Sequence, residues 1–287
     1  ISNNMLQTLL VLTVGILWST MDVLRKFLAK HIEPIPLVFA LTLGHIPIFI
    51  VWCLIYGEVN FNWSWFQIGA VNIILSTFSF LMFIKSLQIS PISKVIPLLS
   101  FTPVFSSIIG FAFLEETLSL ETISGMVLII LASAKLHEDF EFKDMIRNSG
   151  SLLMMGVALI WATIIVLDKL CLTHASVPVH GLLMSTGVLL VLIAIILYKG
   201  EIRKINSAYT NQLGLLSIAI ITMAFAIGLQ LWVISQVPVG IVEGGKRGIG
   251  MIMAVLCGKI FFQEDITTTQ IIAVTTMIIG VLLIVLN

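Results

Sequence analysis

Long apolar runs separated by short polar breaks follow one another along the whole sequence. A helix that crosses a bilayer needs about 20 mainly apolar residues, and ten runs reach or approach that length. They cover approximately residues 5–30, 35–56, 65–87, 91–114, 120–136, 151–173, 177–199, 212–236, 239–262 and 268–286. The breaks carry charge or turn-forming residues. The pattern therefore predicts an all-α polytopic membrane protein with ten transmembrane helices.

The composition supports this prediction and excludes several other classes of protein. Hydrophobic residues make up 59% of the 287 residues and charged residues only 10%, whereas a soluble domain carries about 25% charged residues. The formal net charge is +0, so no global field attracts nucleic acid. The sequence has no CxxC pair, no His/Cys cluster and no nucleotide-binding or hydrolase motif. We therefore expect no enzyme activity, no cofactor, no bound metal and no nucleic-acid partner.

The two halves of the chain resemble each other. Trp18 to His31 reads WSTMDVLRKFLAKH, and Trp161 to His174 reads WATIIVLDKLCLTH. The most polar stretch begins at 137 and lies between the halves. We expect a first five-helix repeat at 1–136, a linker at 137–150 and a second repeat at 151–287. Because five crossings are an odd number, the second repeat must be inverted relative to the first, as in many secondary transporters.

The fourth and ninth runs also correspond to each other. Each begins near a proline, ends in apolar residues followed by an acid, and leads into a short polar turn and one more apolar run. The acids are Glu116 and Glu264. We expect them to have a structural role near the membrane interface, where each carboxylate meets a nearby helix N-terminus.

These features resemble the drug/metabolite transporter superfamily, in its ten-helix branch of two EamA-type repeats. The resemblance rests on the tryptophan in the first and sixth helices and on the glutamate that ends the fourth and ninth, and it covers almost the whole chain. It implies carrier-type export or exchange of small metabolites without fixing the substrate. The inverted repeat places the expected site near the midplane, between the halves.

The most informative charges are Glu243, Lys246 and Arg247 in the ninth run. A charge at the bilayer centre costs about 2.5–3.5 kcal/mol on insertion scales, so such side chains usually face the interior. In one interpretation, Glu243 neutralises both bases on one helical face, at i+3 and i+4. In the other, Lys246 and Arg247 bind an anionic substrate group, with arginine forming a bidentate fork. One acid cannot neutralise two bases, and the pair is similar to the phosphate-binding pair of plastid sugar-phosphate translocators.

Other residues inside the runs are candidates for the same cavity. The further candidates for substrate contact are Lys94, Trp18, Trp161, Asn72 and Gln230. Each also has a structural interpretation, because a lysine near a helix end snorkels to the interface, tryptophans pack, and amides bond to neighbouring helices. Asp22 and Glu243 are candidates for carrying a coupling proton. Asp22 has Arg25 at i+3, with which it can pair instead.

The basic residues of the short loops bear on orientation. The loops after the first, fifth and seventh helices carry Lys30, Lys143, Arg147, Lys199, Arg203 and Lys204. The loops after the second, fourth and eighth helices carry none. The positive-inside rule then places both termini away from the cytoplasm, whereas many members of the superfamily have cytoplasmic termini. The sequence leaves the orientation open.

The sequence thus predicts a multi-pass secondary transporter of the cell (inner) membrane. It would move a small organic metabolite with an anionic group by alternating access. The expected partners are this small-molecule substrate, the lipid bilayer, and a proton or exchange substrate, with the protein as a monomer or homodimer. Two alternatives remain: a flippase for a lipid-linked phosphate, which needs a lateral opening, and a non-transporting scaffold, which has no need of uncompensated bases in lipid.

Overall fold

The computed structural model describes residues 3–56, 59–117, 119–136, 148–200, 209 and 212–285. The regular elements in these ranges are all helices, and they form the ten predicted crossings, with ends within a few residues of the expected ones. In chain order they are α1 (Asn3–Ala29), α2 (Pro34–Tyr56), α3 (Trp65–Ile89), α4 (Ile92–Val95), η1 (Ile96–Ser100), α5 (Phe101–Leu114), α6 (Leu120–Leu136), α8 (Ser149–Cys171), α9 (Val177–Lys199), α11 (Leu213–Ile234), α12 (Val239–Phe262) and α13 (Thr268–Val285).

The fourth crossing is interrupted, which the apolar pattern did not predict. It consists of α4, the 3₁₀ helix η1 and α5, and Pro97 lies in the first turn of η1. Proline has no backbone N–H, and its ring clashes with the carbonyl four residues earlier. A regular α-helix therefore does not continue through this point. The repeat-related crossing, α12, carries Gly244 and Gly245 at this level and remains α-helical.

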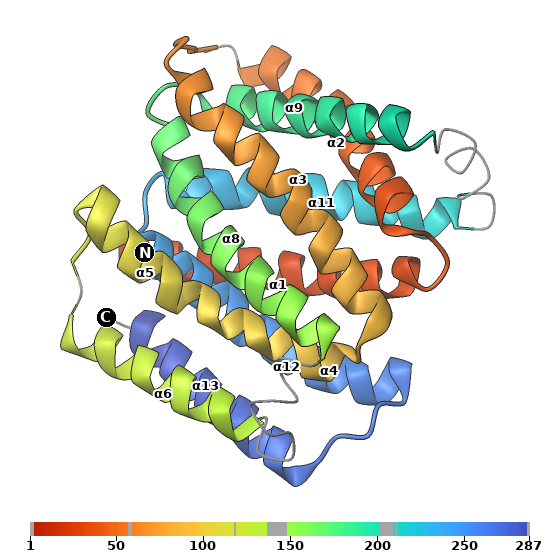
Figure 1. Cartoon of the computed structure of the whole chain (residues 1–287). Helices are drawn as coiled ribbons and strands as arrows, with labels where there is room; N and C mark the ends of the chain where they lie inside the picture. Colours follow the sequence, from red (N-terminus) through yellow and green to blue (C-terminus); the bar gives the residue numbers. More distant parts are fainter. Residues whose placement is uncertain are drawn as a thin grey trace.

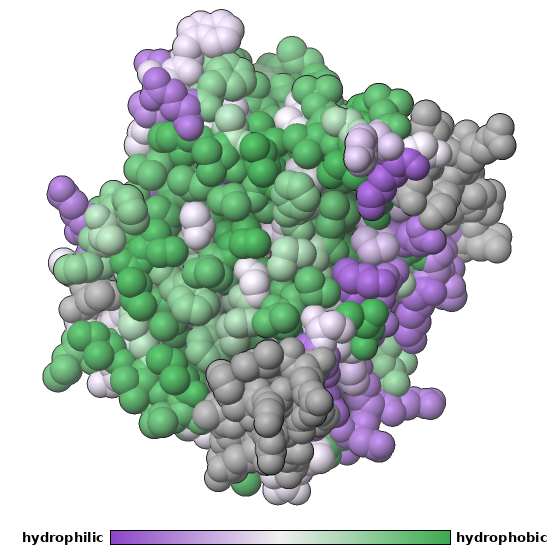
Figure 2. Space-filling view, in the orientation of Figure 1, coloured by the Kyte–Doolittle hydropathy of each residue, from purple (hydrophilic) through white to green (hydrophobic). Residues whose placement is uncertain are grey.

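The outer surface is apolar, as expected for a bundle that lies in lipid. Seven crossings are long and apolar enough to span a membrane by length and composition, and α6 and α13 contain shorter apolar stretches. Large apolar side chains stand exposed, among them Leu54 at 79% and Phe113 at 71%. Figure 2 shows apolar residues across the middle of one face and hydrophilic residues gathered toward its edges. Such a surface matches lipid and is unusual on a soluble monomer.

The two repeats are inverted relative to each other. α1 begins and α13 ends on the same side of the bundle, which we call the terminal side (Figure 1). Since successive crossings alternate in direction, the terminal side also holds the loops at 59–64, 172–176 and 235–238. The opposite side holds the loops at 30–33, 90–91 and 263–267. The chain at 137–147, most of the expected linker, lies outside the described residues.

Helices with the same place in the two repeats pack against each other. α2 lies against α9, α5 against α12, and α6 against α13 (Figure 1). The other main contacts between repeats occur in matched pairs. The contact of α3 with α8 corresponds to that of α11 with α1, and the contact of α1 with α12 corresponds to that of α8 with α5. A two-fold relation between inverted repeats produces this pairing. The interface between the repeats therefore runs through the middle of the bundle.

Each repeat caps a helix of the other repeat with a glutamate. Glu116, just after α5, accepts a hydrogen bond from the backbone N–H of Val239 at 3.2 Å, where α12 begins. Glu264, just after α12, accepts from the N–H groups of Ile92 and Ser93 at 2.7 and 2.9 Å, where α4 begins. The first N–H groups of a helix lack partners inside the helix, and the helix dipole favours a negative charge there. The structural role predicted for both glutamates is confirmed.

Two local features let each glutamate fold back onto the bundle. The residue before it has a left-handed backbone, with φ of 56° at Glu115 and 53° at Gln263, which ends the helix. One glycine lies within reach of each carboxylate. A Cβ on Gly110 would stand 2.6 Å from the carboxylate after α5, and a Cβ on Gly258 would stand 2.8 Å from the one after α12. Glycine at these positions therefore leaves room for the cap.

A lysine from each repeat strengthens these contacts. Lys169 of α8 donates to Glu116 at 2.8 Å and to the carbonyl of Val237 at 3.2 Å. Lys26 of α1, its repeat counterpart, donates to the carbonyl of Ser90 at 2.6 Å. Both carbonyls directly precede the proline before the next crossing. At each end a lysine thus binds the carbonyl before this proline, and Lys169 also pairs with the capping glutamate.

We expect Glu264→Gln to lower the free energy of unfolding by about 1–2 kcal/mol, because it removes the negative charge at the start of α4. Asp265→Asn is the matched control. It neutralises the next residue, which is exposed, and should change stability by less than about 0.5 kcal/mol. Chemical unfolding of the purified protein in mixed micelles checks both variants. Equal stability of Glu264→Gln and wild type would contradict the capping role.

Candidate functional site

A cavity of about 110 Å³ lies between the two repeats. Its walls come from α1, α2, α3, α8, α9, α11 and α12. In α9 the lining positions run from His180 to Val188, and in α12 they are Glu243 and Lys246. These positions lie in the half of each helix nearest the terminal side. The cavity therefore extends from the middle of the bundle toward the terminal side, and its mainly apolar wall with a few polar groups is typical of small-molecule sites.

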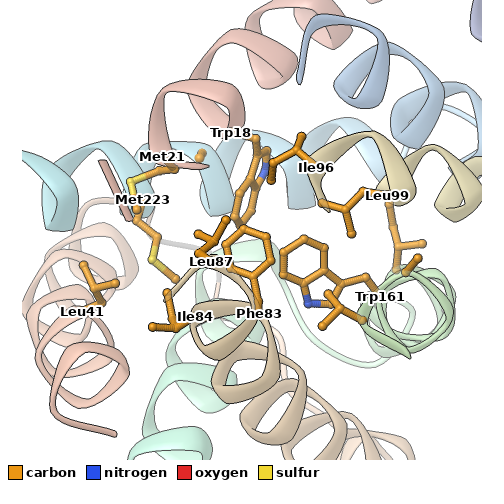
Figure 3. Close-up of a cluster of buried hydrophobic side chains, with 14 of the residues drawn as sticks. Trp18, Met21, Leu41, Phe83, Ile84, Leu87, Ile96, Leu99, Trp161 and Met223 are labelled. Atoms are coloured by element: carbon orange, nitrogen blue, oxygen red, sulfur yellow. The ribbon is translucent and has the colours of Figure 1, made fainter. Parts of the chain in front are cut away.

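An apolar cluster closes the cavity toward the opposite side. Figure 3 shows Trp18, Phe83 and Trp161 in this cluster, together with Ile84 and Leu87. The rings of Phe83 and Trp161 have their centres 4.9 Å apart. Phe83, Ile84 and Leu87 are almost completely buried, and they follow one another along α3 toward the opposite side. These buried side chains therefore lie between the cavity lining and the opposite side.

The three charges of α12 are brought together as an ion-pair cluster. Glu243, Lys246 and Arg247 are 1%, 6% and 4% exposed. Glu243 pairs with Lys246 through Oε1, and with Arg247 through Oε2 at 3.2 Å. Lys246 also donates to Oε1 of Gln230 at 2.9 Å. The local neutralisation that the sequence left open is present, and one acid against two bases still leaves one positive charge in this cluster.

Each base of the cluster lies over the ring of a tryptophan from another helix, which is α1 for Lys246 and α8 for Arg247. Nζ of Lys246 is 5.2 Å from the ring centre of Trp18, and Cζ of Arg247 is 5.2 Å from that of Trp161. The face of an indole attracts a cation, by about 2 kcal/mol when the pair is desolvated. Gly15 allows α1 to approach α12 this closely, because it has no side chain. A Cβ at this position would stand 3.1 Å from a backbone carbonyl of α12. Both tryptophans line the cavity.

Asp22 and Arg25 form a second buried ion pair, within α1. Their closest atoms, Oδ1 and Nη1, are 3.5 Å apart. The guanidinium of Arg25 also lies over the rings of Trp18, Phe80 and Phe83, at 5.2, 5.4 and 5.4 Å. Neither charged residue is among those that line the cavity. Asp22, a predicted coupling residue, is thus paired with the arginine one turn away.

A third polar group lies on the wall formed by α8 and α9. Asp168 of α8 accepts from Asn72 of α3 at 2.6 Å and contacts Nε2 of His180 at 3.1 Å. Trp65 donates its indole N–H to Nδ1 of His180 at 2.9 Å. Asp168 and His180 line the cavity, whereas Asn72 does not and bonds to a neighbouring helix instead. Asp168 and His180 are not among the sequence-predicted site residues, and their partners come from separate crossings that only the structure brings together.

The remaining candidates lie in two different places. Gln230 lines the cavity and holds Lys246. Lys94 is half-buried at the start of the fourth crossing, near the opposite side and outside the cavity lining. Arg247 is also outside the lining. The described residues contain no group of three or more His, Cys, Asp or Glu side chains that could hold a metal ion.

We expect Glu243→Gln to cost about 3–5 kcal/mol of stability, because it leaves Lys246 and Arg247 buried without a counter-charge. The triple variant Glu243→Gln/Lys246→Met/Arg247→Met removes all three charges and should lose less than the single variant. Chemical unfolding in mixed micelles compares the two. A triple variant that is no more stable than Glu243→Gln would show that charge compensation is not what Glu243 supplies.

Comparisons with known proteins agree with this architecture. A protein of Methanothermobacter thermautotrophicus described as an uncharacterized transporter is 28% identical over 195 residues, which cover 64% of this chain and 53% of that protein, so the chain spans about half the length of this relative. A protein of known crystal structure shares the fold, with a TM-score of 0.69 at 15% identity over 98% of this chain and 97% of its own. The model of the EamA-like transporter family matches residues 5–136 and 148–286, one match for each repeat. The chain therefore belongs to the EamA-like transporter family.

Proposed function

We propose that this protein is a secondary transporter of the cell (inner) membrane that carries a small organic metabolite with an anionic group by alternating access. The observation that supports this most directly is Lys246, a buried base that lines the cavity and belongs to a cluster with one acid and two bases. Ionisable residues in membrane segments are costly and commonly mark a substrate or ion pathway. An anion bound to Lys246 compensates the surplus charge.

Lys246 can accept such an anion without losing its ion pair. An ammonium group has three donors, and the contacts of Nζ are with Glu243 and the neutral amide of Gln230. An anionic oxygen can occupy the third position or replace the amide. Arg247 lies outside the lining, so it contributes its positive charge rather than a direct contact. Trp18 and Trp161 also line the cavity and can contact the rest of the metabolite.

The shape of the cavity fits one state of an alternating-access cycle. It extends toward the terminal side, and the apolar cluster around Phe83 separates it from the opposite side. Inverted repeats allow the two halves to exchange conformations, which opens the other side of a shared site. In the alternate state we expect the cluster around Phe83 and Leu87 to separate and the terminal-side walls to approach each other.

The test is the thermal stability of purified protein against a panel of phosphate monoesters, carboxylates and sulfonates. A ligand at about one hundred times its Kd stabilises the folded state by about 2.7 kcal/mol, which raises the unfolding temperature measurably. We expect stabilisation of wild type and loss of this response in Lys246→Gln. This variant leaves Glu243 paired with Arg247 alone, so the α12 cluster itself contains no unpaired charge. Uptake of a stabilising compound into proteoliposomes then measures transport.

Lys94→Gln is the matched control, because it removes a lysine from outside the cavity and should respond to anions as wild type does. An equal response in Lys246→Gln and wild type would overturn the proposed contact. A response only to lipid-linked phosphates in nanodiscs would indicate a flippase. A folded protein that responds to no solute and catalyses no uptake would favour a scaffold.

A further inference from the structure

The hydrogen bonds around His180 fix its tautomer. The indole N–H of Trp65 is only a donor, so Nδ1 of His180, 2.9 Å away, must be the acceptor and carry no proton. The neutral ring then has its proton on Nε2, which donates to Oδ1 of Asp168 at 3.1 Å. A second proton on Nδ1 would place two N–H groups against each other. Trp65 and His180 are fully buried, so His180 stays neutral. The net charge of the Asp168–His180 pair is therefore the single negative charge of the carboxylate.

Asp168 therefore differs from the other two acids inside the bundle. Asp22 is paired with Arg25, and Glu243 is shared by two bases. Asp168 has hydrogen bonds on Oδ1 only, from Asn72 and His180. Within the described part of the chain, Oδ2 has no hydrogen bond and Asp168 has no lysine or arginine within salt-bridge distance. Of the three acids it alone lines the cavity without a cationic partner.

The groups around Asp168 are neutral or lie across the cavity. The titratable and charged side chains that line the same cavity are His180 of α9, His45 of α2, and Glu243 and Lys246 of α12, and Cys171 lies one turn away in α8. Asn72 of α3 is bonded to Asp168, and Gln230 of α11 lines the same cavity. Lys169, the next residue in α8, is directed to Glu116 instead. The negative charge of Asp168 thus shares one cavity with the surplus positive charge of the α12 cluster.

We propose that Asp168 binds a proton that is co-transported with the anionic substrate, one proton for each negative charge. This inference rests on the proposed function. With Asp168 ionised, its charge balances the surplus of the α12 cluster, and an added anion leaves the cavity negative. When Asp168 takes up a proton, the cavity has one positive charge in excess, and one anionic group at Lys246 restores neutrality. Charge balance in a cavity of low dielectric therefore favours binding of proton and anion together.

The proton step involves a single bond. A proton from water in the cavity binds to Oδ2 of Asp168, and the carboxylate becomes a neutral carboxylic acid. Oδ1 keeps its hydrogen bonds from Asn72 and His180, so the surrounding helices do not need to move. Release of the anion removes the compensating charge, and the proton returns from Oδ2 to water. His180 acts as a positioning residue, because it orients the carboxylate and takes up no proton itself.

Infrared spectroscopy of the purified full chain tests the proton site without any substrate. Because the exposed carboxyl groups also protonate as the pH is lowered, the readout is the difference between two spectra, and we expect wild type to show one carboxylic C=O stretching band more than Asp168→Asn. This variant keeps the carbonyl oxygen that accepts from Asn72 and His180, so its fold should be retained. Asp22→Asn is the matched control and should keep the band that Asp168→Asn lacks, because Asp22 is paired with Arg25. The same spectrum in wild type and Asp168→Asn would overturn the proposal.

A second measurement tests the coupling, with benzenesulfonate as the anionic probe because its charge does not titrate. In wild type we expect its apparent Kd to decrease by up to about tenfold for each unit of decreasing pH, since binding of proton and anion is linked. In Asp168→Asn the Kd should not depend on pH in this way. A pH-independent Kd in wild type would overturn the coupling. No benzenesulfonate binding at any pH, with the infrared band intact, would contradict the anion site and leave the proton site supported.

Discussion

The structure depends on one constraint, which is that charges inside a lipid bilayer must find their counter-charges within the protein. Glu243 meets Lys246 and Arg247, and Asp22 meets Arg25. Aromatic faces supply further compensation, since the indole rings of the first and sixth crossings lie over three of these cations. These contacts join α1 to α12 and α12 to α8. The arrangement that neutralises the charges is therefore also the arrangement that builds the wall of the cavity.

The same constraint operates at the ends of the bundle. The helices α4 and α12 begin with N–H groups that need acceptors, and each receives a carboxylate from the crossing that ends beside it. Because Glu116 and Glu264 have equivalent places in inverted repeats, one cap lies on each side of the membrane. The repeats are thus held together at both ends, by one cap from each repeat, while a cavity lies in the middle of their interface. This division suits a transporter, whose repeats must stay together while they move around a central site.

Much of this was accessible from the sequence, because the relevant signals are local. Run lengths predicted the ten crossings, and the odd number of helices per repeat predicted the inversion. The spacing of Glu243, Lys246 and Arg247 gave ion pairing as one of two interpretations. The interruption at Pro97 was also a local signal, but the apolar run masked it. The interactions of Asn72, His180 and Asp168 could not be predicted from the sequence. They join three crossings, and no single segment determines how these helices are rotated relative to one another.

The sequence by itself determined the number of crossings, the inverted repeats, the end caps and the charges that had to be buried. These features depend on hydropathy and on i, i+3 and i, i+4 spacing, which act within one helix. They are therefore determined by each segment alone, before the helices pack. The tertiary structure alone decided which buried groups face the cavity: Lys246 does and Arg247 does not, and Asp168 does without a cationic partner. The reason is geometric, because the rotation of each helix about its axis depends on all the helices packed against it.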